Sequence, residues 1–289
     1  MREFTVPTPG ASLAVRESRP EGEPLLLLHG GPGVPDSMQT DTAPLLPELR
    51  AISFDQRGVG SSHCRDGRYG IDDYLADIEA IREYLGIEGW HVLGHSWGGL
   101  LAQLYAERFG PRVRSLALSS SSLGVGADWK RTKRESFRIE LRRAGAGGTL
   151  RFYLFGSLLV TPEPLRGWGM RHLMTEVWHD YFADPGSAPD PDSGWLAGCS
   201  AQAMILTDRA LAHTRACALA TPSAYPGRVL VLYGEDDIFG TSAGVVRRRF
   251  PEATQVTLER SGHLHWLQNP AGYREVLHRF YAADRPATP

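Results

Sequence analysis

The stretch Gly94-His95-Ser96-Trp97-Gly98 decides the fold of this chain. It is a Gly-x-Ser-x-Gly sequence that lies between an apolar run at 90–93 and a helical pattern at 99–109. A sharp strand-to-helix turn of this kind, called a nucleophile elbow, holds its central serine in a strained and exposed position. Glycines flank the serine because side chains there would clash with neighbouring backbone. The pentapeptide therefore predicts a buried strand, an elbow at Ser96 and a helix.

Composition excludes several classes of function. The 289 residues are 42% hydrophobic and 22% charged, which is ordinary for a globular domain, and the net charge of −2 gives no electrostatic basis for binding nucleic acid or an anionic membrane. The N-terminal residues lack the apolar core of a signal peptide, and the three cysteines show no metal-ligand spacing. We therefore expect a cytoplasmic protein without metal or cofactor, and without a nucleic-acid or membrane partner. Oligomeric state is left open.

Short apolar runs alternate with helical patterns on both sides of the elbow. Strands are predicted at 13–16, 25–28, 51–54 and 113–118, and again at 229–233 and 255–258. Helices are predicted at 73–85 and 271–281 from apolar residues at helical spacing. Alternation of this kind predicts an α/β fold with a mostly parallel central sheet and helices on both faces.

Residues 122–222 differ from the rest of the chain in composition and in hydrophobic pattern. They are rich in aromatic residues and arginine, show recurring helical periods and contain no clear strand pattern. We interpret them as an inserted helical cap, with residues 1–121 and 223–289 forming the core. The basic stretch 131–143 is expected to be a cap helix, and Arg247-Arg248-Arg249 a solvated helix face.

A serine nucleophile needs an imidazole to take its proton and a carboxylate to orient that imidazole. The strand at 229–233 leads into Gly234-Glu235-Asp236-Asp237, and the next strand leads into Ser261-Gly262-His263. Both segments lie at the carboxyl ends of predicted parallel strands, where ligand sites gather. Ser96, Asp237 and His263 are therefore the predicted triad. Glu235, Asp236 and His265 remain as alternatives to the acid and the base.

The negative oxygen of a tetrahedral intermediate needs hydrogen-bond donors. One predicted donor is the backbone N–H of Trp97, next to the nucleophile. The other is the backbone N–H of Gly31, in the glycine-rich loop His29-Gly30-Gly31-Pro32-Gly33 that follows an early strand.

Three motifs carry a family resemblance: His29-Gly30-Gly31-Pro32-Gly33, Asp55-Gln56-Arg57-Gly58-Val59-Gly60-Ser61-Ser62 and Gly94-His95-Ser96-Trp97-Gly98-Gly99. Together they resemble the prolyl aminopeptidase (proline iminopeptidase) branch of the α/β-hydrolase superfamily. The resemblance covers about residues 24–120 well and 228–268 moderately. It implies the triad and the two oxyanion donors named above, with Asp55 and Arg57 bracing the oxyanion loop.

The sequence departs from that family at the elbow. Family members often carry Gly-Gly-Ser-Trp-Gly there, whereas His95 precedes the serine here, as in many esterases. Relatives also hold the substrate's α-ammonium group with acidic residues of the cap. Glu176 and Asp180 are the candidates in this chain, and Glu176 is chosen as the substrate-binding residue.

The resulting expectation is a metal-independent serine hydrolase that acts through an acyl-enzyme. Its leading form is a proline iminopeptidase-type aminopeptidase on a small molecule, such as a short peptide or an amide. The alternative is a carboxylic-ester or lactone hydrolase with the same triad. A non-catalytic binding protein on the same fold is disfavoured by the complete set of nucleophile, acid, base and oxyanion loop.

Overall fold

The computed structural model describes residues 1–282, apart from the side chain of Cys217. Its centre is a nine-stranded sheet in the order β1-β2-β4-β3-β6-β7-β8-β9, with β5 paired to β2. The strands are β1 (Arg2–Pro7), β2 (Ala11–Glu17), β3 (Pro24–Leu28), β4 (Arg50–Phe54), β5 (His63–Cys64), β6 (Trp90–His95), β7 (Val113–Ser119), β8 (Arg228–Gly234) and β9 (Thr254–Leu258). From β4 to β9 every pairing is parallel, whereas β2 pairs with β1, β4 and β5 in antiparallel fashion.

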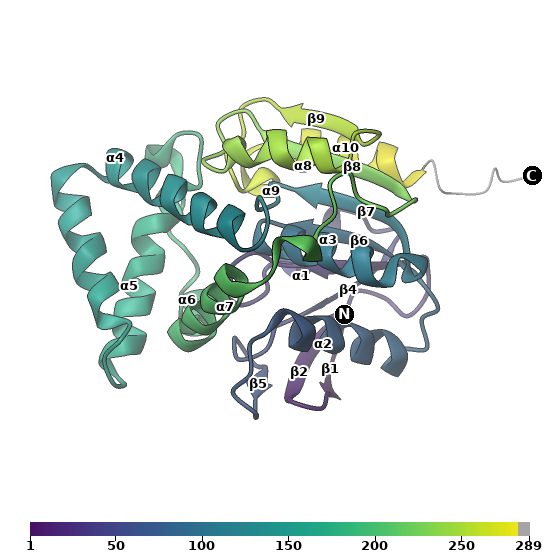
Figure 1. Ribbon diagram of the computed structural model, residues 1–289, viewed down its shortest axis with the longest axis horizontal. Coiled ribbons are helices and arrows are strands. Elements are labelled where there is room, and N and C mark those ends of the chain that lie inside the picture. The colour runs from purple at the N-terminus through teal and green to yellow at the C-terminus, as the bar shows by residue number, and fades with distance from the viewer. Residues whose placement is uncertain (283–289) are drawn as a thin grey trace, which may run out of the picture.

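Within residues 1–282, ten α-helices cover the sheet and extend from it (Figure 1). They are α1 (Met38–Asp41), α2 (Ile71–Tyr84), α3 (Trp97–Phe109), α4 (Ala127–Leu158), α5 (Leu165–Asp180), α6 (Ser193–Ala197), α7 (Ala201–His213), α8 (Ala243–Arg249), α9 (His265–Gln268) and α10 (Pro270–Ala282). Single 3-10 turns lie at Ala43–Leu45, Gly110–Arg112, Pro185–Ser187, Ala216–Ala218 and Gly240–Ser242.

Two hydrophobic cores form because successive strand residues point to opposite faces of the sheet. In β3, Leu26 and Leu28 pack into the core under α2, α3 and α8, whereas Leu25 and Leu27 pack into the core under α1, α9 and α10. All four leucines are fully buried. The predicted mostly parallel sheet with helices on both faces is therefore confirmed.

Residues 122–222, which we call the cap, hold α4 to α7 and no strand among the residues that the structure describes. In Figure 1 these helices extend from one end of the sheet, with α4 and α5 antiparallel and side by side. Gly145 interrupts α4 with a left-handed backbone (φ +62°), so the long helix bends there. Met170, Leu173 and Val177 of α5 give the cap a small apolar core of its own.

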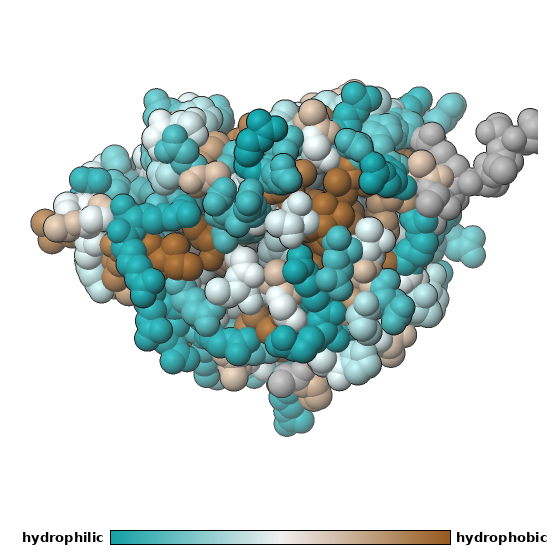
Figure 2. All heavy atoms as spheres, turned by 90° about the horizontal axis from the view of Figure 1, so that it is seen from above, coloured by the Kyte–Doolittle hydropathy of each residue, from teal (hydrophilic) through white to brown (hydrophobic). Residues whose placement is uncertain are grey.

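Several apolar side chains on the outside of the cap are exposed. They are Leu150, Tyr153, Leu154, Val160, Leu165 and Trp168. The space-filling view shows an apolar area at the cap end of the molecule, bordered by hydrophilic side chains (Figure 2). None of the helices within residues 1–282 combines the length and the apolarity needed to cross a bilayer.

The prediction that Arg249 is exposed to solvent was wrong. Arg249, expected on a solvated helix face, is buried, and its guanidinium donates hydrogen bonds to Gln103 Oε1 and to the Leu123 carbonyl at 3.1 Å. The carbonyl and amide oxygens compensate the desolvation of the charge. Arg249 thereby connects α8 to α3 and to the segment that enters the cap.

Candidate active site

Ser96 lies at the sharp turn between β6 and α3 with φ +56° and ψ −119°, a conformation that non-glycine residues rarely adopt. Its N–H donates to the Ser119 carbonyl at 3.0 Å, and its carbonyl accepts from Ser122 N–H at 3.0 Å. A Cβ at position 98 would collide with the carbonyl oxygens of Leu28 and His29. The backbone around Ser96 is therefore overdetermined by its neighbours, which is how strain at one residue persists.

Asp237 and His263 lie at the same edge of the sheet, in the loops that follow β8 and β9. His263 Nδ1 is 3.0 Å from Asp237 Oδ1, and both side chains are almost completely buried. Burial alone would raise the pKa of Asp237, but the charge and hydrogen bond of His263 and a hydrogen bond from Ser120 lower it to about 2. The carboxyl group is thus ionised and aimed at the histidine ring across the physiological pH range.

The alternatives to this pair lie elsewhere. Glu235 and Asp236 are exposed at the start of the same loop. His265 is fully buried, and both of its ring nitrogens are within hydrogen-bond distance of serine hydroxyls, Ser120 and Ser261. His263, in contrast, lines a cavity together with Ser96. The structure therefore brings the predicted nucleophile, acid and base to one place and leaves the alternatives outside it.

The cavity has a volume of about 740 Å³ and lies between the sheet edge and the cap. The core contributes the loop after β3, the elbow and the loop after β9, while the cap contributes Met174, Trp178, Tyr181 and residues of α6. The ring of His263 packs against Tyr181, Phe239 and His95 at centroid distances of 5.1, 4.6 and 4.5 Å. The base is thus packed against three rings and lines a pocket of a size that suits a small substrate.

Both predicted oxyanion donors border the region around Ser96. Trp97 is the first residue of α3, so its N–H has no acceptor within the helix and lies at the positive end of the helix dipole. Gly31 lines the cavity with φ +129°, which favours glycine. These features suit the two N–H groups to a developing negative oxygen.

Gln56 braces the oxyanion loop, a role the sequence assigned to its two neighbours. Its side chain donates to the His29 carbonyl at 3.0 Å and accepts from the Trp97 indole N–H at 2.7 Å, so it joins the loop to the elbow helix. Asp55 also contacts the extended loop, because its Oδ1 accepts from Asp36 N–H at 2.9 Å. Arg57 does not contact it, and instead forms a buried ion pair with Asp77 of α2 at 2.8 Å.

His95, the departure from the peptidase pattern, has a structural partner in the loop of the base. Its Nε2 is 3.0 Å from the His263 carbonyl, and its ring packs edge-on against Trp266 at 4.7 Å. Burial, helped by the nearby histidines, lowers the pKa of His95 well below its usual range, so it is neutral and donates from Nε2. His95 therefore connects the elbow to the backbone of the catalytic-histidine candidate.

The choice of Glu176 as a substrate-binding residue finds no support in its surroundings. Its carboxylate is paired with the Arg151 guanidinium at 2.7 and 3.0 Å, and neither Glu176 nor Asp180 lines the cavity. Asp180 is buried near Glu140, whose pKa is raised to about 7 by burial, against the opposing effect of Lys133. These cap carboxylates therefore lie outside the described cavity wall.

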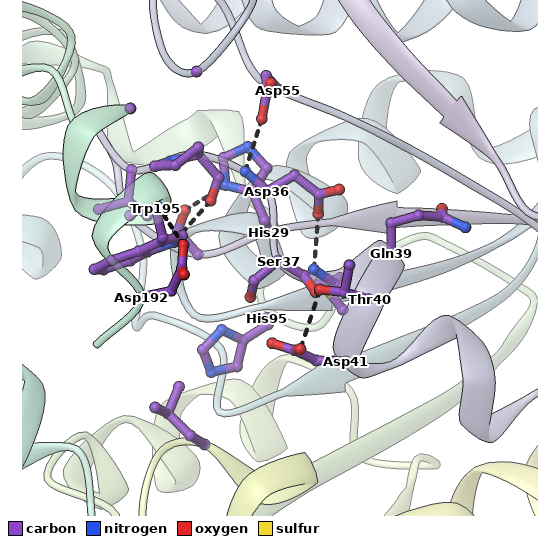
Figure 3. Close-up of a pocket in the computed structure, with 18 of the residues that line it drawn as sticks. His29, Asp36, Ser37, Gln39, Thr40, Asp41, Asp55, His95, Asp192 and Trp195 are labelled. Carbon is purple, nitrogen blue, oxygen red and sulfur yellow. Dashed lines mark hydrogen bonds between the residues drawn. The ribbon is translucent and has the colours of Figure 1, made fainter. Parts of the chain in front are cut away.

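Different carboxylates line the cavity, and of these only Asp55, as a brace of the oxyanion loop, was singled out from the sequence. Asp36 lies in the loop after β3, Asp41 ends α1, Asp55 follows β4, and Asp192 precedes α6 of the cap (Figure 3). Asp36 and Asp55 are engaged by Arg16, at 3.5 and 2.9 Å. Asp41 accepts a hydrogen bond from the neighbouring Thr40 hydroxyl at 3.1 Å, and burial raises its pKa against the opposing effect of hydrogen bonds from Ser37, Thr40 and Trp266. Asp192 caps α6 through the Trp195 N–H at 2.7 Å.

Asp41 and Asp192 come close to Ser96 only when the chain folds, so the sequence alone could not reveal them as cavity residues. Asp41 lies 55 positions before Ser96 and Asp192 lies 96 positions after it, so no local motif joins them.

Within residues 1–282, no group of three or more His, Cys, Asp or Glu side chains has an arrangement that could hold a metal ion.

The sheet, the elbow and the order of the site residues define the class of protein: the chain has the α/β-hydrolase fold. A family model described as "alpha/beta hydrolase fold" matches residues 23–139. A solved carboxylesterase structure from Nitrososphaera gargenis superposes with a TM-score of 0.71 at 18% identity, covering 98% of each chain. The solved proline iminopeptidase of Mycobacterium smegmatis gives 0.67 at 22%, covering 98% of this chain and 100% of that one.

Sequence relatives, which match about a third of the chain, are more specific than the fold. The proline iminopeptidase of Neisseria gonorrhoeae is 41% identical over 102 residues, which are 34% of this chain and 33% of that protein. The one from Lactobacillus helveticus is 39% identical over 113 residues, 36% and 37% of the two chains. The resemblance to proline iminopeptidases is confirmed, and the matched segment spans about a third of the length of these relatives.

Proposed function

We propose that this protein is a serine hydrolase that forms an acyl-enzyme on Ser96 and releases an N-terminal residue, such as proline, from a small peptide or amide. The observation that carries the proposal is the 3.0 Å contact between Asp237 and His263 in the loops facing the elbow serine, with His263 and Ser96 on one cavity wall. A serine, a histidine and an ionised carboxylate supply this chemistry without a metal.

In the first half of the proposed reaction, Ser96 Oγ attacks the substrate carbonyl while His263 Nε2 takes the hydroxyl proton. Asp237 holds the Nδ1–H of the same ring and stabilises the imidazolium that forms. The N–H groups of Gly31 and Trp97 donate to the oxygen of the tetrahedral intermediate, which we expect to contribute about 10²–10³-fold in rate for each donor. His263 then returns the proton to the leaving amine, and the acyl group stays on Ser96.

In the second half, a water molecule enters beside His263 and repeats the sequence. The imidazole takes the water proton, the hydroxide adds to the acyl carbonyl, and the Ser96 oxygen leaves with the proton that His263 returns. The product is a free carboxylic acid and the regenerated hydroxyl. No atom beyond the substrate and one water is consumed.

The aminopeptidase form of the proposal is supported by the carboxylates of the cavity wall. A free α-ammonium group needs a negative partner, and a partly desolvated carboxylate is a strong one. Asp41, which is half-buried, and Asp192, which is exposed, both line the pocket, and neither forms an ion pair with a side chain of residues 1–282. The similarity to proline iminopeptidases points in the same direction. Asp41 and Asp192 therefore replace Glu176 as the proposed ammonium partners.

A carboxylic-ester or lactone hydrolase is the second candidate, and one observation favours it. The acidic cap residues Glu176 and Asp180 do not reach the cavity, while Trp178, Trp195 and Trp266 line it with apolar surface. Such a wall suits an apolar acyl or alcohol group. The same triad would then act on a better leaving group with no ammonium to bind.

The two candidates separate in a paired assay. Turnover of prolyl and other aminoacyl arylamides is compared with turnover of simple p-nitrophenyl esters on the same enzyme. Arylamide cleavage that is lost when the substrate amine is acetylated supports the aminopeptidase. Fast ester cleavage without arylamide turnover overturns it in favour of the esterase.

Conservative variants then test the ammonium partners. Asp41→Asn and Asp192→Asn are expected to raise KM for the arylamide and leave ester turnover unchanged, because only the arylamide carries the ammonium. Glu176→Gln is the matched control, since that carboxylate is already paired with Arg151. An equal effect of all three variants on both substrates would remove Asp41 and Asp192 from the proposal.

A further inference from the structure

The second oxygen of the Asp237 carboxylate has partners of its own. Asp237 Oδ1 faces His263 and also accepts from Phe239 N–H at 2.8 Å, while Oδ2 accepts from the Ser120 hydroxyl. Ser120 Oγ is in turn 2.8 Å from His265 Nε2, and His265 Nδ1 is 2.8 Å from Ser261 Oγ. All of these side chains are buried. The proposed triad therefore continues into a buried chain of three further groups.

The protons available on these groups allow only one donor-to-acceptor order along this chain of hydrogen bonds. Asp237 is ionised and can only accept, so the single Ser120 proton points to it. Ser120 Oγ then accepts from His265, which requires the proton of that ring to be on Nε2. The remaining nitrogen, Nδ1, accepts from the Ser261 hydroxyl. Burial lowers the pKa of His265 to about 4, which keeps the ring neutral and suited to this arrangement.

Ser120 is held in place at an energetic cost. It is fully buried just after β7 with φ +48°, and it is one of three non-glycine residues with positive φ in the described chain. Its N–H donates to the Leu232 carbonyl of β8 at 2.8 Å, which fixes the backbone beside the strand that leads to Asp237. Backbone strain of this kind persists where the surrounding structure imposes it, and it gathers at functional sites.

We propose that Ser120 and His265 are positioning residues that fix the plane of the Asp237 carboxylate so that Oδ1 faces His263 throughout the reaction. The proposal rests on the serine-hydrolase function proposed above. Neither residue contacts substrate, because neither lines the cavity. Ser120 acts by its hydrogen bond to Oδ2, and His265 acts by orienting the Ser120 hydroxyl toward the carboxylate.

The direct test is Ser120→Ala, with Ser115→Ala as the control. Ser115 lies on β7, the strand that Ser120 follows, is equally buried and is hydrogen-bonded to another buried histidine, His91, at 2.8 Å. A hydrogen bond to a charged group is strong enough for its loss to lower kcat by about tenfold or more. We expect that fall in Ser120→Ala with KM within about twofold, and no such fall in Ser115→Ala.

A second pair of variants keeps the proposal testable if Ser120→Ala does not fold. His265→Gln retains an amide N–H that can donate to Ser120 and an oxygen that can accept from Ser261, whereas His265→Leu retains neither. We expect His265→Gln to stay within about threefold of the wild-type kcat and His265→Leu to fall clearly below it.

Labelling of Ser96 by a fluorophosphonate separates failure of this proposal from failure of the proposed function. We expect every folded variant to reach one label per chain, but Ser120→Ala and His265→Leu to reach it more slowly, because misplacement of Asp237 affects a rate and not the folded fraction. Equal labelling rates and kcat in all variants would overturn the positioning role while leaving the function intact. Absence of labelling in the wild type would overturn the function itself.

Discussion

Asp237 shows at the scale of one residue how position decides chemistry. It is the third of three consecutive acidic residues, yet it alone is buried and in contact with His263, while Glu235 and Asp236 face solvent. Three donors, from His263, Phe239 and Ser120, surround its carboxylate. These donors stabilise the negative charge of Asp237 next to His263, whose ring becomes an imidazolium in the proposed reaction.

Replacing Asp237 by asparagine should remove that charge and leave the shape. An amide favours the wrong tautomer of His263 and cannot stabilise the imidazolium, so we expect kcat to fall by roughly 10⁴-fold, as for other triad acids. Asp236→Asn is the matched control, because its carboxylate is exposed, and it should retain wild-type kcat within about twofold. A comparable loss in both variants would contradict the assignment of Asp237.

The elbow is the element on which the site depends, and it has no room for a side chain at Gly98. A methyl group there would meet backbone oxygens of Leu28 and His29, which cannot move aside without displacing β3. We expect Gly98→Ala to lower the free energy of unfolding by about 3 kcal/mol or more, measured by urea denaturation.

A helical glycine elsewhere is the control for the elbow. Gly156 lies in α4 with open space where a Cβ would be. Gly156→Ala should therefore raise stability, by up to about 1 kcal/mol, through helix propensity alone. If Gly98→Ala proved as stable as the wild type, the tight packing of the elbow against β3 would be incorrect.

The elements of the core could be predicted because their signals are local. The apolar runs of β3, β6 and β8 and the helical spacing of α2 depend on residues close in sequence. The order of Ser96, Asp237 and His263 followed from strand ends, since parallel strands share one edge. Strand β1 was missed because most of its residues are exposed, and because its strand conformation depends on pairing with β2.

The parts that sequence could not supply depend on contacts between distant segments. Arg249 looked like a surface arginine within a run of three until Gln103 and Leu123, far earlier in the chain, provided its partners. Glu176 looked like a substrate ligand because it lies in the cap, but Arg151 pairs with it. Such outcomes depend on tertiary packing, which no local pattern encodes.

At the scale of the whole molecule, the fold buries several neutral histidines, two of which, His95 and His265, lie near the ionised Asp237. Burial lowers the pKa values of His29 and His95, and lowers that of His265 to about 4. For each of them the unfolded chain binds a proton more readily than the folded one. Their contribution to stability is therefore fully present above about pH 6.5 and is lost as the pH falls toward the folded-state value.

Acid should consequently weaken the fold through these histidines as the pH falls below about 6.5. His265 alone should lower the free energy of unfolding by about 2 kcal/mol between pH 7 and pH 5, which urea titrations at the two pH values can measure. His265→Gln cannot take up a proton, so its stability should fall less over the same interval. An identical pH dependence in wild type and variant would show that His265 does not titrate as its burial implies.

The measurement that tests the central claim most directly is fluorophosphonate labelling of the folded protein, with the modified residue located by peptide mass spectrometry. The site geometry predicts one adduct per chain, on Ser96, which disappears in Ser96→Ala and forms far more slowly in Asp237→Asn. An adduct on another residue, or no adduct on folded wild-type protein, would contradict the assignment of Ser96 as a nucleophile activated by His263 and Asp237.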